Sequence, residues 1–498
     1  MKNNNKMFYP NWPKNFIFLT IFFVAIIFSI SFPFKTFAGE NWYNDSWSYR
    51  KKITIDHTKV FNTNQSDFPV LISLADSDLQ IHGRSDGHDI LFTDSSGTIK
   101  IPYEREQYIS STGNLVAWVK IASLSHMTDS VIYMYYGNSE ASDQQDITGE
   151  TWGANFKGVW HSQDAAVTTL ADSTVNANTG AKKAIDEPAE ITGKIGQAQN
   201  YDGIDDYIRI NPTGTLSGSF TVSTWVKVSD AENSYTIFGT RNGDDMSFDF
   251  KLENGETIHG DIGNGTDWIT NEADANLSYS YNTWYQITYV ITPIGYTIYL
   301  DGNEAASGSY PEDTPLLFDS GHNLFIGQVG YDEELFNGVI DEVRISDIAR
   351  SGDWIQTEYN NQNSPSTFYS LGNETIDDET SPTISNINSL KADGAYKTGA
   401  IIDINVTFSE DVTSTGNIIV NLDTGGSCSF TITNSNAGSC NYTIGDDENS
   451  SDLNVSSVSG TIKDATGNSM INFTPATNLA TNKNLIIDTI APTVPGSP

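Results

Sequence analysis

The titratable side chains of this sequence do not gather into a familiar catalytic pattern. Many zinc hydrolases place two histidines four residues apart, next to a glutamate. The seven histidines here never take that spacing; they are His57, His82, His88, His126, His161, His259 and His322. The sequence also has no glycine-rich phosphate loop followed by lysine. It therefore favours neither a zinc hydrolase nor a nucleotide-binding enzyme.

The carboxylates need a separate test, because polysaccharide hydrolases act with two acidic side chains in one cleft. On a β-strand such side chains must alternate, since successive residues point to opposite faces. The closest candidates, Asp341 and Glu342, are adjacent in a strand-like run. We interpret Asp341 as a structural residue that accepts hydrogen bonds from backbone amides, with Arg344 as the partner of its neighbour. The sequence thus predicts no enzyme activity.

Composition limits the possible partners. The chain has 498 residues and a formal net charge of −37, from 63 acidic and 26 basic side chains. This length predicts three domains of ordinary size. The negative charge argues against nucleic-acid binding, because it repels phosphate backbones. It is compatible with weak calcium binding by loop carboxylates, or simply with a soluble acidic surface.

The N-terminal region has the pattern of an export signal. Lys2, Lys6 and Lys14 precede the apolar run 16–30, and small residues before Gly39 offer a cleavage site. We predict a signal peptide over residues 1–38, with an uncleaved membrane anchor as the alternative. Either one places the rest of the chain outside the cytoplasm, released or at the cell surface, with the anchor as its only membrane contact.

The two cysteines, Cys428 and Cys440, lie in strand-like runs on either side of the turn residues 434–438. In an exported chain this predicts a disulfide across a β-hairpin, which would stabilise the fold by about 2–3 kcal/mol. Two free thiols are the alternative.

Short runs that alternate apolar and polar residues dominate the chain. In Phe220–Val228 the alternation predicts one dry face and one wet face, with Thr221 and Ser223 on the wet side. Residues 301–303 (Asp-Gly-Asn) predict a tight hairpin, because glycine and asparagine tolerate a positive φ. Trp354–Gln362 predicts a short helix or turn that closes the sandwich, and Phe368–Gly372 an edge strand.

These patterns predict an all-β fold of three consecutive β-sandwich modules. The predicted boundaries are 39–150 for the first module, 151–373 for the second, 374–380 for a linker, 381–490 for the third and 491–498 for the start of a possible further repeat. The Pro-Thr pair at Pro382 recurs at Pro492, one immunoglobulin-like domain length later. The sequence is therefore expected to be part of a longer protein.

The first and third modules resemble known families. The first is similar to an exported bacterial domain of unknown function (DUF2341) through Trp47–Lys51, Gly87–Asp94 and Tyr135–Asn138. That family has no assigned activity, so the resemblance implies none. The third resembles a bacterial immunoglobulin-like repeat through Phe408–Val412, Asp464–Asn468 and Ile487–Thr493.

The second module resembles the laminin-G-like, concanavalin A-like jellyroll family of exported multidomain proteins. The resemblance is carried by Asp202–Tyr207, Phe220–Val228, Leu300–Gly302 and Phe336–Arg344. It implies a jellyroll, a fold that glycoside hydrolases also use.

Two loops of this module, Tyr235–Asp245 and Ile326–Glu334, resemble the calcium-binding loops of the pentraxin branch of the jellyroll. The resemblance implies a calcium ion at one rim, with ligands from Asp244, Asp245, Gln328, Asp332 and Glu333. Solvated turn carboxylates without an ion are the alternative. No other cofactor is predicted.

An exposed aromatic ring can bind the apolar face of a sugar by stacking. Trp268 lies in a stretch rich in glycine and asparagine, and we predict it as a sugar-binding residue with Tyr279 and Tyr281 behind it. A packing role for Trp268 is the alternative.

Together the patterns predict an exported binding or adhesion protein of the cell surface. The jellyroll would bind an extracellular glycan or protein ligand, and the other modules would act as spacers. One alternative is a polysaccharide-degrading enzyme, or the non-catalytic portion of one. Another is a structural component of a surface layer or stalk.

Overall fold

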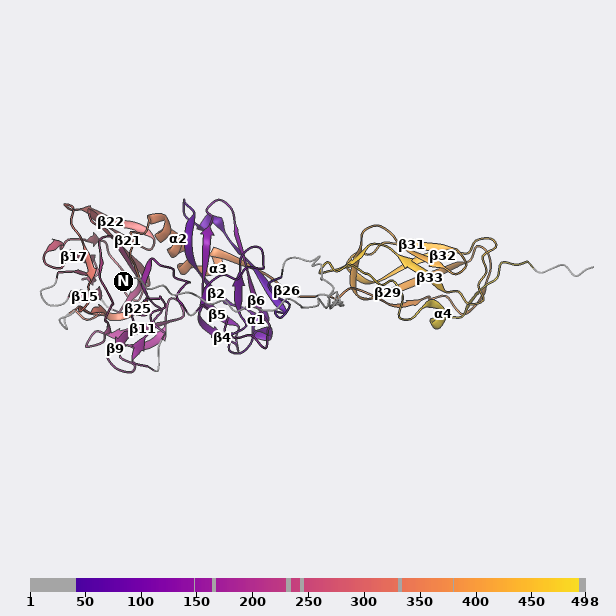
Figure 1. Ribbon diagram of the computed structural model, residues 1–498, viewed down its shortest axis with the longest axis horizontal. Coiled ribbons are helices and arrows are strands. Elements are labelled where there is room, and N and C mark those ends of the chain that lie inside the picture. Colours follow the sequence, from indigo (N-terminus) through magenta and orange to yellow (C-terminus); the bar gives the residue numbers. More distant parts are fainter. Residues whose placement is uncertain are drawn as a thin grey trace, which may run out of the picture. The chain divides into compact units, whose positions relative to one another are not determined.

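The computed structural model describes residues 42–146, 148–163, 167–229, 234–241, 246–329, 334–378 and 380–491 (Figure 1). β-strands dominate these ranges, which confirms the predicted all-β class. The predicted signal or anchor at residues 1–38 lies outside them. Among the described residues, no helix combines the length and the apolar character needed to cross a membrane.

The first module is a sandwich of two antiparallel sheets. Its own elements are β1 (Tyr49–Ile55), η1 (His57–Lys59), β2 (Gln65–Ala75), α1 (Ser77–His82), β3 (Leu91–Thr93), β4 (Tyr103–Ile109), β5 (Asn114–Leu124) and β6 (Ser130–Tyr136). One sheet has the order β2-β5-β4, and the other has the order β26-β1-β6-β3, in which β26 (Tyr369–Ile376) comes from much later in the chain. Apolar side chains such as Val70, Trp118 and Met134 are completely buried in its core.

The second module consists of two large sheets that enclose a separate apolar core. Its elements are β7 (Phe156–Trp160), β8 (Thr169–Leu170), β9 (Gly180–Lys182), β10 (Ala189–Thr192), β11 (Gln197–Asp202), β12 (Ile208–Ile210), β13 (Leu216–Ser217), β14 (Phe220–Val228), β15 (Ser234–Gly239), β16 (Phe248–Glu253), β17 (Thr257–Gly263), β18 (Trp268–Thr270), β19 (Ala275–Asn276), β20 (Tyr285–Thr292), β21 (Gly295–Leu300), β22 (Asn303–Ser309), β23 (Leu316–Phe318), β24 (Leu324–Ile326), β25 (Asn337–Ser346), α2 (Gly352–Asn363) and α3 (Pro365–Phe368). One sheet has the order β10-β11-β25-β14-β20-β21-β22, with β7 also paired to β25. The other has the order β18-β17-β16-β15-β24-β12-β9-β8, with β19 also paired to β17.

Local sequence explains much of this module. Asp301 and Gly302 have φ values of 50° and 77°, which confirms the predicted tight hairpin between β21 and β22. In β14, however, the predicted wet face is wrong, because Thr221 and Ser223 are buried as well. The segment that leads into α2 covers this face: the Thr221 hydroxyl donates to the carbonyl of Ile348 and accepts from the amide of Arg350.

The predicted helix is confirmed as α2, which begins after the capping residue Ser351. Instead of only closing its own sandwich, α2 packs on the first module. The Asn361 side chain accepts a hydrogen bond from the backbone amide of Leu71 at 2.7 Å and donates one to its carbonyl at 3.1 Å. One helix of the second module is thereby fixed to β2 of the first.

The edge strand predicted near Phe368–Gly372 is confirmed as β26, but it belongs to the sheet of the first module. It pairs antiparallel with β1, from Ile55 opposite Tyr369 to Tyr49 opposite Ile376. In Figure 1 it lies among the indigo strands of that module. The amides and carbonyls of β1 would otherwise form an open sheet edge. The structure therefore differs from the predicted boundary at residue 373, because the chain returns to the first module before leaving it.

The third module is a β-sandwich with its own core. Its elements are β27 (Ile384–Asn388), β28 (Gly394–Tyr396), β29 (Ile401–Ser414), β30 (Ile418–Leu422), β31 (Ser427–Phe430), β32 (Ser435–Thr443), β33 (Val455–Ser459), β34 (Ile462–Asp464), α4 (Leu479–Asn482) and β35 (Leu485–Ile487). The disulfide Cys428–Cys440 is present, with the Cα atoms 5.7 Å apart. The predicted hairpin is wrong, because β31 pairs with β30 and β32 pairs with β29. The disulfide therefore connects two sheets.

Candidate functional site

The acidic pair singled out in the sequence lies on β25, at the contact between the first and second modules. Asp341 Oδ2 accepts hydrogen bonds from the backbone amides of Lys194 and Ile195, at 2.9 and 3.0 Å, which confirms its predicted structural role. Glu342 has a φ of 53° and lies where the pairing of β14 and β25 shifts register. Its Oε2 is 2.6 Å from Arg344 Nη2, so the predicted ion pair is confirmed too.

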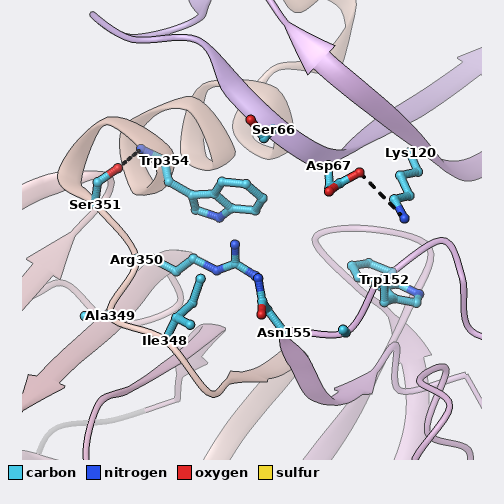
Figure 2. Close-up of a pocket in the computed structure, with 12 residues that line it drawn as sticks. Ser66, Asp67, Lys120, Trp152, Asn155, Ile348, Ala349, Arg350, Ser351 and Trp354 are labelled. Carbon is cyan, nitrogen blue, oxygen red and sulfur yellow. Dashed lines mark hydrogen bonds and ion pairs between the residues drawn. The ribbon is translucent and has the colours of Figure 1, made fainter.

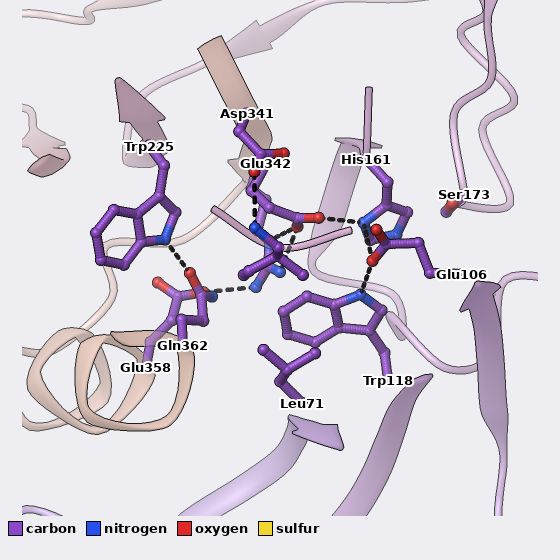
Figure 3. A network of polar contacts seen from close by, with 12 residues as sticks. Leu71, Glu106, Trp118, His161, Ser173, Trp225, Asp341, Glu342, Glu358 and Gln362 are labelled. Carbon is purple, nitrogen blue, oxygen red and sulfur yellow. Dashed lines mark hydrogen bonds and ion pairs between the residues drawn. The ribbon is translucent and has the colours of Figure 1, made fainter. Parts of the chain in front are cut away.

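Around this pair, charged groups from both modules form one network (Figure 3). Arg344 Nη1 is also 2.8 Å from Glu358 Oε1 on α2. The other oxygen of Glu342 is 2.7 Å from Nδ1 of His161, the residue that follows β7. One buried guanidinium thus links β25 to α2, and one carboxylate links β25 to the end of β7.

The first module contributes Glu106 on β4 and Trp118 on β5. Glu106 Oε2 accepts a hydrogen bond from Trp118 Nε1 at 2.9 Å and lies 3.6 Å from His161 Nδ1. The Trp118 ring also covers Arg344, whose Cζ is 4.1 Å from the ring centroid. We call Glu106, His161, Glu342, Arg344 and Glu358 the junction network.

Two acids and a histidine could in principle transfer protons, but burial argues against that use. The side chains of Glu106 and Glu342 are each 1% exposed, that of Arg344 is 2% exposed and that of His161 is 7% exposed. A polymer could not reach them. Buried charges are stable only when they are paired and hydrogen-bonded, so the network holds the modules together.

Burial and neighbouring charge keep protons in the junction network. Burial, reinforced by the charge of Glu342, raises the pKa of Glu106 to about 8. Burial alone would lower the pKa of His161, but the carboxylates of Glu342 and Glu104 outweigh it and hold that pKa well above 6.5. At neutral pH, the network therefore favours a protonated Glu106 and a charged His161.

A second polar cluster lies on the nine-stranded sheet, on the face away from the core. We call Arg241, Asp249, His259 and Asp261 the sheet-face cluster. Asp249 on β16 is directly opposite Asp261 on β17. Arg241 Nε is 3.3 Å from Asp249 Oδ2, and His259 Nε2 is 3.4 Å from Asp261 Oδ1. Burial and the adjacent Asp261 raise the pKa of Asp249 to about 8.

The predicted calcium ligands surround this cluster only in part. Gln328 is 3% exposed, and its Oε1 has no hydrogen-bond partner among the described residues. Its backbone oxygen and Asp249 both lie against Gly239, at the end of β15. Asp244, Asp245, Asp332 and Glu333 lie outside the described residues. The described part of the predicted site is thus one buried amide beside the sheet-face cluster.

The structure separates the three predicted sugar-binding aromatic residues. Trp268 is half-buried on β18, with its ring centroid 5.5 Å from Arg241 Cζ. Tyr279 is 7% exposed, packs in the core and accepts a hydrogen bond from the amide of Gly255. Tyr281 is 49% exposed. Both tyrosines lie toward the Gly255 end of β17, roughly 20 Å along the strand from Trp268, so the three do not form one surface.

Asp249, His259 and Asp261 were not among the residues predicted from the sequence. A signal for them exists in Phe248–Glu253, where Phe248, Phe250 and Leu252 alternate with charged residues. A carboxylate between two phenylalanines of one strand must project from the face opposite the core. Their cross-strand pairing depends on the register of β16 and β17, which alternation alone does not give.

Residues 202–356 match the family model of the concanavalin A-like lectin/glucanases superfamily. Residues 86–158 match the domain of unknown function DUF2341. The predicted order of these two families is therefore confirmed, and the second module is a concanavalin A-like domain. A comparison with curated proteins finds no match.

Three solved structures illustrate the similarity of the chain to known proteins. Domain 4 of an extracellular arabinanase from Geobacillus stearothermophilus is 18% identical, covers 42% of this chain and 98% of its own, and has a TM-score of 0.32. Botulinum neurotoxin type C is 11% identical over 63% of this chain and 91% of its own, also with a TM-score of 0.32. The CBM40 module of the Ruminococcus gnavus IT-sialidase is 14% identical over 28% and 82%, with a TM-score of 0.26.

The contact between the concanavalin A-like domain and the first module should weaken as pH rises. The pKa of Glu106 in the folded protein is about 8, above its ordinary 4.5. Its contribution to the free energy of unfolding is therefore complete below pH 4.5 and is lost as pH rises through 8. The raised pKa of His161 acts in the same direction, because its contribution to stability is lost as pH rises above 6.5. We expect Glu106→Gln, which still accepts from Trp118 Nε1, to be more stable than the wild type at pH 9 by about 2 kcal/mol and similar at pH 5.

Urea unfolding followed by tryptophan fluorescence at the two pH values measures this difference. All ten tryptophans precede residue 381, so the signal does not report on the third module. A Glu106→Gln variant that loses as much stability between pH 5 and 9 as the wild type would contradict the assignment.

Proposed function

We propose that this protein is an exported binding protein of the cell surface, whose concanavalin A-like domain binds an extracellular glycan without cleaving it. The observation that carries the proposal is the position of Trp268. Its half-buried ring lies at the edge of the nine-stranded sheet, next to Arg241 and the buried pair Asp249–Asp261. A ring face beside fixed hydrogen-bonding groups is the usual composition of a sugar site.

The burial of the carboxyl groups supports binding over hydrolysis. Glycoside hydrolases place two carboxyl groups in a cleft where the glycosidic bond reaches both. Asp249 and Asp261 are buried opposite each other on adjacent strands, and Arg241 and His259 already lie against them. Asp341 and Glu342 are buried and engaged by backbone amides, His161 and Arg344. Neither pair suits the cleavage of a polymer.

Calcium would belong to the same rim. The residues proposed as its ligands are Asp244, Asp245, Gln328, Asp332 and Glu333. Amide and carboxylate oxygens are the donors that calcium prefers, and the buried Oε1 of Gln328 without a described partner suits that role. Asp249 is not included, because Arg241 already supplies a positive charge beside it. A bound calcium ion would supply positive charge that holds the two loops together.

The remaining modules complete the proposal. The first module forms a fixed base for the concanavalin A-like domain through the junction network and β26. The third module, a disulfide-linked sandwich, would act as an immunoglobulin-like spacer. The signal or anchor segment would deliver the protein to the outside of the cell.

Replacement of Trp268 tests the glycan site. We expect Trp268→Ala to weaken glycan binding about tenfold, because the ring provides the stacking surface. A glycan array first identifies a bound glycan, and calorimetry with that glycan then compares variants of the full chain. Tyr281→Ala is the matched control, since this exposed ring lies at the other end of β17, and it should bind as the wild type does. Unchanged binding by Trp268→Ala would remove the proposed site.

Calcium addition tests the metal proposal. We expect calcium to release heat in a titration and to raise the thermal unfolding midpoint, because it binds the folded state. Magnesium should have little effect, since it keeps its water ligands more firmly. Gln328→Leu should abolish the calcium shift. Absence of heat and of a midpoint shift for the wild type would exclude a calcium site.

A further inference from the structure

A cleft lies where the segment before α2 meets the first module (Figure 2). It has a volume of about 620 Å³, within the range of small-ligand sites. Ser66, Asp67 and Lys120 line it from the first module, and Arg350 and Trp354 line it from the concanavalin A-like domain. Trp152 and Asn155, from the connection between the two, complete the lining. This cleft is separate from the sheet-face cluster and from Trp268.

The Arg350 guanidinium is oriented into this cleft. Its Nε donates to the Ser346 hydroxyl at 3.2 Å, and its Cζ lies 4.0 Å from the centroid of the Trp354 ring and 4.6 Å from that of Phe156. Figure 2 shows the group among the labelled lining residues, beneath the Trp354 ring. The side chain is therefore held in one position by a hydrogen bond and two aromatic rings.

The Nη atoms of Arg350 are available to a ligand. Among the described residues, neither Nη atom forms a hydrogen bond or an ion pair. The nearby acids are already engaged, since Glu358 pairs with Arg344 and Asp347 pairs with Lys157 at 2.9 Å. Burial lowers the pKa of Arg350 to about 10, so the group is still charged at neutral pH. A charge in this setting is stabilised by an anion that fits its planar fork.

The rest of the lining suits hydroxyl groups. Lys120 Nζ and Asp67 Oδ1 are 3.7 Å apart, so the two charges partly offset each other. Both side chains can still form hydrogen bonds with a ligand. The side chains of Asn155 and Ser66 are exposed at the rim. These groups offer both donors and acceptors, which is what the hydroxyls of a sugar require.

We propose that this cleft binds an acidic sugar, a uronic acid residue. The carboxylate would accept two parallel hydrogen bonds from the Nη atoms of Arg350, and Asp67, Lys120 and Asn155 would bind the ring hydroxyls. A carboxylate matches the guanidinium in shape and charge, whereas a neutral sugar would leave Arg350 unpaired. Because the lining comes from both modules, the ligand would bridge them.

Calorimetry with the full chain tests this proposal, with trigalacturonic acid as the probe and its methyl ester as the neutral analogue. We expect binding of the acid and about tenfold or more weaker binding of the ester, because charged hydrogen bonds are lost. Arg350→Gln should weaken binding of the acid to a similar degree, and Arg350→Lys should cause an intermediate loss, since lysine cannot form the paired contact.

Two further variants distinguish a loss of binding from a loss of folding. Arg209→Gln, which changes an exposed arginine on β12 outside the cleft, should bind the acid as the wild type does. Asn155→Ala changes an exposed rim residue and should weaken binding a few-fold. Equal affinity for acid and ester, or unchanged binding by Arg350→Gln, would overturn the proposal. Binding of inorganic phosphate as tightly as the uronate would overturn it as well. Failure of Trp268→Ala to affect its own glycan would not bear on this cleft.

Discussion

The structure depends on one buried guanidinium. Arg344 is 2% exposed and is held between Glu342 on its own strand and Glu358 on α2. Removal of a charge from water costs several kcal/mol unless partners replace the water, so all three side chains must be in place together. The ring of Trp118, from the first module, covers the same guanidinium. The contacts of Arg344 therefore extend from its own strand to both modules.

Further contacts join the first module to the concanavalin A-like domain. Asn361 on α2 completes the hydrogen bonding of Leu71, and β26 completes the sheet of β1. Their apolar cores meet as well, since Trp354 and Ile355 of α2 belong to the core of the first module. The domain of unknown function is therefore part of the support of the concanavalin A-like domain, and it supplies part of the lining of the cleft around Arg350.

Local sequence predicted those features that depend on neighbouring residues. The hairpin at Asp301-Gly302 follows from the positive φ that its turn requires, and the structural role of Asp341 follows from its place in an apolar strand. The features that it did not predict depend on residues far apart. The pairing of Tyr369–Ile376 with β1 joins segments about 300 positions apart, and nothing in either segment specifies the other. The disulfide was predicted, but its strands pair with β29 and β30, so it bridges two sheets.

The candidate sites show the same division. Trp268 could be recognised from its polar surroundings, but its separation from Tyr279 and Tyr281 follows from the length of β17. The pair Asp249–Asp261 and the cleft at Arg350 exist only because separate strands or modules bring single residues together. Their spacing along the chain therefore does not predict that they form a site.

We expect the first module and the concanavalin A-like domain to unfold as one cooperative body, held by the junction network. Native-state hydrogen exchange on the full chain, as a function of low denaturant concentration, tests it most directly. The account predicts that the slowest amides of β5 and of β14 open with the same free energy and the same denaturant dependence. Opening of β5 at a clearly lower free energy than β14 would contradict it, because the first module would then unfold while the concanavalin A-like domain remains intact.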